Sequence, residues 1–276
     1  MLDEILSLIQ MPFIQNALLG ILPISLLCGI VGCLISINRL SYVAGALTHG
    51  AYGGVGLGVY FGLPILLSAS FFSLVLALVM AYLISRYRTH SDNFIGAIWA
   101  FGMAIGIILI ELSDGYKADM MGYLFGNILL ITTQNLYIMA ILALVFSLLL
   151  FFFFPQFQAL SYDEDFAKTR GIASQKFFFT MMIMIAFCIT ASMQAVGLIL
   201  VIALLSIPPF IAQNLSQTLK GMMILSVIFN CLFCFVGLIF SFYFNLSSGA
   251  SIILTSVAGF VLYLGITKLT KLRCDS

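Results

Sequence analysis

The stretch that decides the fold is FIQNALLGILPISLLCGIVGCLISI, residues 13–37, which contains no charged side chain. As a helix, a run of this length extends about 38 Å, which exceeds the roughly 30 Å hydrocarbon core of a bilayer. Backbone amides and carbonyls in lipid must be bonded within the segment itself. The run is therefore predicted to cross the membrane as a helix.

The composition extends this interpretation to the whole chain. Of its 276 residues, 63% are hydrophobic and 8% are charged, whereas soluble domains carry about 25% charged residues. So few charges cannot cover a soluble surface, and the apolar side chains are predicted to face a lipid bilayer. The net charge of +1 provides no basic face, so we expect no nucleic-acid partner. Cys231 and Cys234 lie in an apolar run and are interpreted as packing residues.

Further apolar runs predict an all-α, polytopic membrane protein with eight or nine membrane helices. The predicted segments are 13–37, 42–61, 65–85, 93–112, 128–154, 177–194, 196–213, 221–243 and 250–267. The two segments that meet near Val196 can form one long or broken helix, which leaves the count between eight and nine.

The basic residues favour nine segments and fix the orientation. With nine alternating segments, ten of the eleven lysines and arginines fall on one side, and only Lys117 falls on the other. Cytoplasmic loops carry the excess of positive charge. The N-terminus is therefore predicted outside and the C-terminus in the cytoplasm.

The longest cytoplasmic loop, about residues 155–176, contains a segment that is typical of a short capped helix. In residues 161–172, either Ser161 or Asp163 can accept bonds from the first amides, and Gly171 can end the helix. Acidic residues precede basic ones, as the helix dipole favours. Two interpretations stay open from the residues alone: a solvated spacer, or an element that a partner protein grips.

The second predicted segment combines a glycine repeat with a histidine. Gly50, Gly54 and Gly58 recur at every fourth residue, which is typical of a face packed closely against another helix. His49 lies in the same segment. Ionisable groups inside a membrane usually face a cavity, a pathway or a partner, and neutral imidazole is a good ligand for transition metals. The alternative is a histidine that donates one hydrogen bond to a neighbouring helix.

Acidic residues gather in one external connection, where Glu111, Asp114 and Asp119 are candidates for a pathway entrance. Carboxylates at that position would raise the local cation concentration, and docking of a soluble partner is the alternative. The sequence contains no phosphate-binding loop of the type G-x-x-x-x-G-K-[ST] and no nucleophile–base motif. We therefore expect no enzyme and no permanently bound cofactor. Pro208 and Pro209 are expected to break the seventh segment.

Five motifs follow one another along the chain. They are Asn38 to Gly50 (NRLSYVAGALTHG), Met121 to Leu129 (MGYLFGNIL), Asp165 to Ile172 (DFAKTRGI), Ala195 to Pro208 (AVGLILVIALLSIP) and Ser241 to Ile252 (SFYFNLSSGASI). Together they resemble the permease subunits of zinc and manganese ABC importers, the ABC-3 family. Each motif is short, and their shared order over residues 38–255 carries the resemblance.

The resemblance implies a fold like that of the vitamin B12-type importers, with residues 1–276 as one transmembrane permease domain in a bacterial inner membrane. Two copies would enclose a pathway, each coupled to a cytoplasmic ATPase, and an extracytoplasmic metal-binding protein would deliver the ion. The implied cargo is a divalent transition metal, zinc first and manganese or iron next, with His49 as a pathway ligand. The segment 161–172 becomes the coupling helix. Its implied contact residues are Asp163, Asp165, Phe166, Ala167, Arg170 and Gly171.

Three positions depart from the family pattern. Gly45 stands where many relatives have aspartate, Ala100 where some zinc-type relatives have histidine, and Asn127 where many members have aspartate. These departures remove metal ligands from the implied pathway. A metal chelate or small solute is therefore a second hypothesis for the cargo, and an ATP-independent channel or carrier is a third for the mechanism.

Overall fold

Long helices make up most of the computed structural model, which describes residues 12–87, 91–113, 126 and 128–274. The nine long helices in this part of the chain are α2 (Pro12–Ile37), α3 (Ser41–Phe61), α4 (Ile65–Arg86), α5 (Ser91–Glu111), α7 (Thr133–Tyr162), α9 (Ser174–Val196), α10 (Leu198–Leu215), α11 (Leu219–Phe244) and α12 (Ser248–Cys274). The connections contain the short helix α8 (Glu164–Thr169) and the 3-10 turn η2 (Ile128–Leu130). No strand occurs among the described residues, which confirms the predicted all-α fold.

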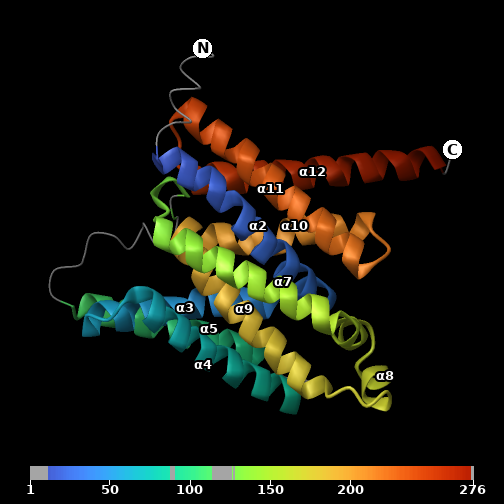
Figure 1. Cartoon of the computed structure of the whole chain (residues 1–276), viewed down its shortest axis with the longest axis horizontal. Coiled ribbons are helices and arrows are strands. Elements are labelled where there is room, and N and C mark those ends of the chain that lie inside the picture. The colour runs from blue at the N-terminus through green and yellow to red at the C-terminus, as the bar shows by residue number, and fades with distance from the viewer. Residues whose placement is uncertain (1–11, 88–90, 114–125, 127, 275–276) are drawn as a thin grey trace.

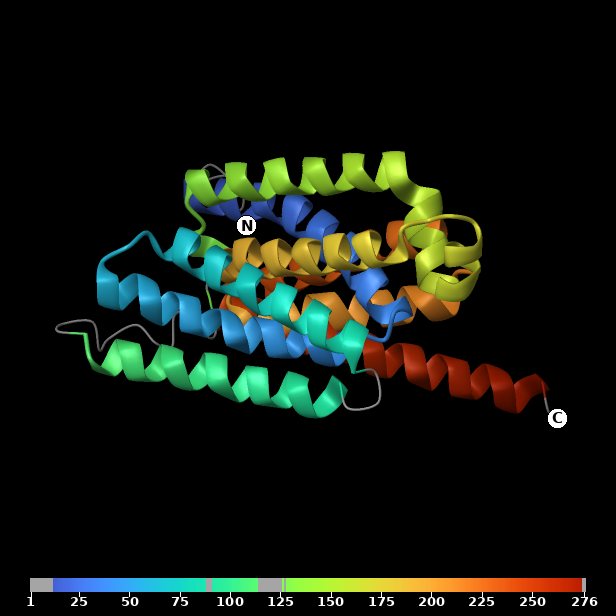
Figure 2. The same ribbon diagram turned by 90° about the horizontal axis from the view of Figure 1, so that it is seen from below.

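Consecutive long helices run in opposite directions, because most connections are only a few residues long (Figures 1 and 2). The start of α2 and the end of α12 therefore lie at opposite ends of the bundle (Figure 1). The central helix is α2, which packs against α7, α9, α10 and α11. A second group, α3 to α5, joins this core mainly through the contact of α4 with α9, and α12 packs on α10 and α11.

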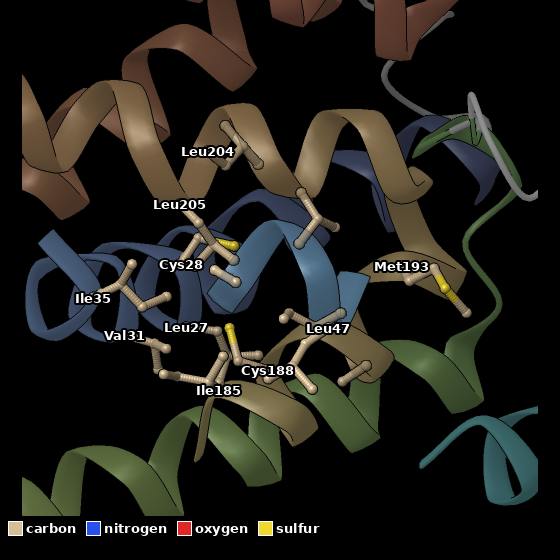
Figure 3. Packing of buried hydrophobic residues seen from close by; sticks show 14 of the residues in the cluster. Leu27, Cys28, Val31, Ile35, Leu47, Ile185, Cys188, Met193, Leu204 and Leu205 are labelled. Atoms are coloured by element: carbon tan, nitrogen blue, oxygen red, sulfur yellow. The ribbon is translucent and has the colours of Figure 1, made fainter. Parts of the chain in front are cut away.

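The core is built around the buried face of α2, which meets side chains of α3, α9 and α10 (Figure 3). Its labelled members from α2 are Leu27, Cys28, Val31 and Ile35. Cys28, Cys33, Cys188, Cys231 and Cys234 are free, and Cys28 Sγ lies 3.9 Å from Ser192 Oγ of α9. The free thiols of Cys231 and Cys234 agree with their interpretation as packing residues.

Eight of the described helices are long and apolar enough to cross a membrane. The remaining long helix, α3, falls short because its glycines, tyrosines and His49 lower its hydropathy, yet it lies between α4 and α5 with a similar length. The two segments that were predicted to meet near Val196 are separate helices. Gly197 divides them with φ 83° and ψ 163°, a conformation that is essentially restricted to glycine.

The fifth predicted segment, 128–154, is wrong at both ends. α7 begins only at Thr133, where the Thr132 hydroxyl oxygen accepts a bond from the Asn135 amide. Pro155 bends the helix instead of ending it, since the departure from helical geometry is confined to Phe153, with φ −114° and ψ 21°. The helix continues to Tyr162, so the loop predicted at 155–176 is reduced to residues 163–173.

The break expected at Pro208 and Pro209 is also wrong, because α10 continues through both residues to Leu215. Pro209 lacks the amide hydrogen that would bond the Leu205 carbonyl. That carbonyl lies against Gly32 of α2, where an added Cβ would come within 2.8 Å of its oxygen. The absence of a side chain at Gly32 lets α2 cover the freed carbonyl closely, and the helix keeps its course.

The basic residues of the described chain gather at one end of the bundle, the end where α2 and α12 finish (Figure 1). They are Arg39, Arg86, Lys168, Arg170, Lys176, Lys220 and Lys268. All of them lie in or beside helix ends that share this side, because the helices alternate in direction. Glu111, at the end of α5, lies at the opposite end of the bundle.

Candidate functional site

Two rows of glycine hold α3 between α4 and α5. Gly50, Gly54 and Gly58 face α4. A Cβ on Gly54 would lie 2.5 Å from the Cα of Ala69, and a Cβ on Gly56, towards α5, would lie 2.7 Å from the Cα of Gly106. No side chain fits at these contacts, so the backbone of α3 lies directly on both neighbours. This contact fixes the position of His49, which α3 carries.

The imidazole of His49 stacks on the indole of Trp99 from α5, with ring centroids 4.7 Å apart and an interplanar angle of 11°. Tyr42, two turns earlier on α3, meets the same indole edge-on at 6.1 Å. Trp99 is the one tryptophan of the chain. The stack orients the imidazole plane, because the indole packs against both Tyr42 and His49 of α3.

The half-buried His49 has a buried Nδ1 without a hydrogen-bond partner among the residues that the structure describes. The adjacent hydroxyl of Thr48 donates to the Ala44 carbonyl within α3, at 2.7 Å. A histidine whose role is to bond a neighbouring helix would have its ring nitrogen satisfied. Nδ1 therefore makes no bond to a neighbouring described helix, and the role of His49 as a pathway ligand stays a prediction.

The helix face that carries His49 is open. A Cβ added to Gly45, one turn before His49, would meet nothing within 4 Å. Across on α5, a Cβ on Gly96 would meet only the Tyr42 hydroxyl, at 3.8 Å, and Ala100 is exposed. The described chain thus leaves a strip of small residues beside the imidazole uncovered.

No group of three or more histidine, cysteine, aspartate or glutamate side chains that could hold a metal ion occurs in the described ranges. Among the described residues, His49 of α3 therefore stands without the aspartate or histidine that the family resemblance led us to expect near it.

The predicted coupling segment forms a distinct short helix with both ends capped. The carboxylate of Asp163 accepts bonds from the amides of Asp165 and Phe166, at 3.0 and 2.9 Å. At the other end, Gly171 takes φ +75°, and its amide bonds to Lys168 O while the Ile172 amide bonds to Ala167 O. This pair of bonds is the Schellman motif, so both ends of the six-residue helix are capped.

The surface of α8 is polar and charged on its exposed side. Lys168 Nζ lies 2.9 Å from Glu164 Oε1 and 3.4 Å from Asp165 Oδ1. The hydrogen bond to Glu164 raises the pKa of the Lys168 ammonium above its usual value. The ion pair is therefore intact at neutral pH and is lost as rising pH passes through that raised value. The guanidinium of Arg170 lies 5.3 Å from the ring centroid of Phe166.

The residues implied for coupling divide into one anchor and an exposed set. Ala167 is fully buried where α8 packs on α7 and α9, whereas the other members of the set lie at the surface. Ser161, the other candidate cap, belongs to α7, and its hydroxyl accepts a 2.9 Å bond from Asn38 Nδ2. This bond ties the end of α7 to the turn that leads into α3.

The remaining predicted positions are separate from these two sites. Glu111 is exposed at the far end of α5, and Asp114 and Asp119 lie outside the described residues, as does Asn127. Sequence reasoning missed Trp99 and Asn38. A lone tryptophan in an apolar segment was an available signal, whereas its pairing with His49, fifty residues away in sequence, was not.

Comparison with known proteins identifies the family. Residues 10–267 match the model of the ABC 3 transport family. An uncharacterized membrane protein of Synechocystis sp. is 44% identical over 96% of this chain and 94% of its own length. The manganese transport system membrane protein MntC of Listeria monocytogenes is 28% identical, with 91% and 89% covered. A probable iron transport system membrane protein of Haemophilus influenzae is 29% identical, with 98% and 99% covered.

Solved structures agree with these sequence matches. PsaBC from Streptococcus pneumoniae, solved in complex with Fab, is similar with a TM-score of 0.85 and 31% identity, covering 95% of both chains. An ABC transporter in an inward-facing conformation shares the fold at a TM-score of 0.69 and 18% identity, covering 91% of this chain and 85% of that one. The relatives are named as membrane proteins of transport systems, which confirms that the chain is a transport subunit and not an enzyme. The chain belongs to the ABC 3 transport family, as a membrane-spanning subunit of an ABC transporter.

Proposed function

We propose that this chain is the permease of an ATP-driven importer for a divalent transition metal. Two copies would enclose the pathway, a cytoplasmic ATPase dimer would drive it, and an extracytoplasmic metal-binding protein would deliver the ion. The relatives described above are named for manganese and iron. We therefore place these two metals ahead of zinc, which the sequence alone had ranked first.

The observation that carries this proposal is the half-buried His49, stacked on Trp99 beside an uncovered strip of small residues. An unpartnered imidazole in a membrane helix is suited to contact an ion in passing. A second copy that covers the strip would bring a second His49 towards the first. One or two ligands bind an ion weakly, and weak binding allows the ion to leave.

The proposed coupling element is α8, which lies at the basic end of the bundle. The positive-inside rule assigns that end to the cytoplasm, so the N-terminus would lie outside a bacterial inner membrane and the C-terminus inside. Because α8 is capped at both ends and anchored by Ala167, a push from an ATPase would reach α7 and α9 without melting the helix.

The direct test is metal uptake into proteoliposomes that contain this chain, its ATPase and its binding protein. We expect uptake of Mn²⁺ or Fe²⁺ that requires ATP on the side of the membrane that the ATPase faces. Uptake by the chain alone, without ATP, would contradict the proposal and favour a channel or carrier.

A metal chelate is a second candidate cargo, favoured by the open space at Gly45 and Gly96. Competition separates the two candidates. If free Mn²⁺ is the cargo, a chelator in excess abolishes uptake; if a chelate is the cargo, the matching chelator increases it.

A further inference from the structure

A groove runs along the outer surface of α2, between α7 and α11, and has a volume of about 490 Å³. Its walls are apolar, with Leu26 and Ile30 at the floor and Phe151, Ile224 and Ile228 at the sides. Of the lining residues, only Lys220 is charged. The groove lies away from His49 and from α8, so the proposed transport function makes no use of it.

The packing of three helices creates the groove. α2 packs against both α7 and α11. At Gly29 the approach of α11 is close, since an added Cβ would lie 2.9 Å from the backbone nitrogen of Val227. On the other side, the bend at Phe153 turns the last part of α7. The groove is the space left between α7 and α11, and α2 lies beneath it.

One end of the groove is marked by a cation. The ammonium of Lys220, at the start of α11, lies 4.9 Å from the ring centroid of Phe154 on α7. Lys220 is exposed and makes no ion pair with any residue that the structure describes. It belongs to the basic end of the bundle, where the acyl region of a bilayer gives way to headgroups. From Lys220 to Ile228, the groove extends about 12 Å along α11.

The chemistry of the groove selects its occupant: an apolar lining that carries one cation at its end. An apolar slot with one unpaired ammonium at its headgroup end complements an apolar tail that carries one negative charge.

We propose that this groove binds an anionic phospholipid. One acyl chain lies along α2 between α7 and α11, and the phosphate of the headgroup pairs with the Lys220 ammonium. The bound lipid contacts the bent part of α7, which leads directly into α8. An anionic phospholipid bound there would therefore stabilise the position of the last part of α7, from which α8 continues.

The test uses the full chain in nanodiscs of equal phosphatidylglycerol and phosphatidylcholine, followed by native mass spectrometry of the lipids that stay bound. We expect wild-type protein to retain phosphatidylglycerol preferentially. Lys220→Gln should reduce that preference about tenfold, and Lys220→Arg should keep it. Ile224→Trp, at an exposed position of the groove wall, should reduce retention of either lipid without disturbing the core.

Lys268→Gln is the matched control, because Lys268 is exposed at the same end of the bundle but lies on α12. The control should behave as wild type. Equal loss in Lys268→Gln and Lys220→Gln would reveal general attraction to a basic surface and overturn the proposal. Equal retention of both lipids by wild type would overturn it as well. So would a change of oligomeric mass in Ile224→Trp, since the groove would then hold another copy of the chain.

Discussion

At the scale of single residues, a stacked pair decides what the proposed pathway face can do. Trp99 holds the ring of His49 at 4.7 Å while Nδ1 stays unpartnered in the described structure. A histidine buried for packing alone would be replaceable by an apolar side chain of similar size. A histidine that contacts the cargo would not be replaceable.

His49→Ala should therefore lower metal uptake at least tenfold in the reconstituted system, while ATP hydrolysis and yield stay near wild type. Tyr42→Phe is the control, because it keeps the ring beside Trp99 and removes only a hydroxyl. Wild-type uptake of manganese, iron and zinc by His49→Ala would remove this residue from the pathway.

Trp99→Leu should lower uptake less than His49→Ala does, because the imidazole remains but loses its orienting surface. The double variant should be no worse than His49→Ala alone, since both changes act on the same ring. Uptake by the three variants under identical conditions is the measurement. Additive losses would mean that Trp99 acts elsewhere.

At the scale of helices, two glycines on one helix should respond oppositely to the same substitution. Gly54→Ala drives a Cβ to 2.5 Å from Ala69 Cα, and such overpacking costs about 1–3 kcal/mol. Gly45→Ala meets nothing within 4 Å, and alanine in a helix is favoured over glycine by about 1 kcal/mol. Thermal unfolding of the single chain in detergent, at a concentration where it is monomeric, should show a lower midpoint for Gly54→Ala and an equal or higher one for Gly45→Ala. A lower midpoint for Gly45→Ala would mean that its face is covered.

The capped α8 gives a second prediction at this scale. Asp163→Ala removes bonds to two amides and should destabilise this helix by about 1 kcal/mol. We expect ATP hydrolysis to continue while metal uptake per ATP falls. Asp163→Asn, which can still cap, is the control, and unchanged uptake per ATP in Asp163→Ala would exclude a coupling role that depends on the cap.

Helix positions were largely predictable from the sequence, because apolar length and charge placement fix them. One error lay at the start of α7, where Thr132 caps the helix, and the others occurred at prolines. The local sequence pattern predicts a helix end at both Pro155 and Pro208. In the structure, α7 bends beside Pro155 and α10 continues through Pro208. Whether a freed carbonyl finds cover depends on a distant partner such as Gly32. The stack of His49 on Trp99 was hidden for the same reason, since it depends on how α3 lies on α5.

At the scale of the whole molecule, the alternating helices place the described basic residues at one end and Glu111 at the other. In intact cells, a membrane-impermeant maleimide should label Glu111→Cys at once and Lys176→Cys only after permeabilisation. Cys28, Cys33, Cys188, Cys231 and Cys234 lie within the helices, and both variants should carry Cys274→Ser so that this cysteine at the end of α12 adds no background. The reverse labelling pattern would invert the proposed orientation.

Because the described basic residues lie at one end of the bundle, they also influence how the chain is inserted into the membrane during synthesis. Each pair of helices that is joined at the basic end has its own positive residue there, and positive residues are kept in the cytoplasm. The topology is therefore specified by several residues independently. Loss of one charge leaves the rest to hold the chain in place. A single substitution such as Lys220→Gln should therefore leave the topology unchanged, and any change in its bound lipid reports on the groove and not on an inverted protein.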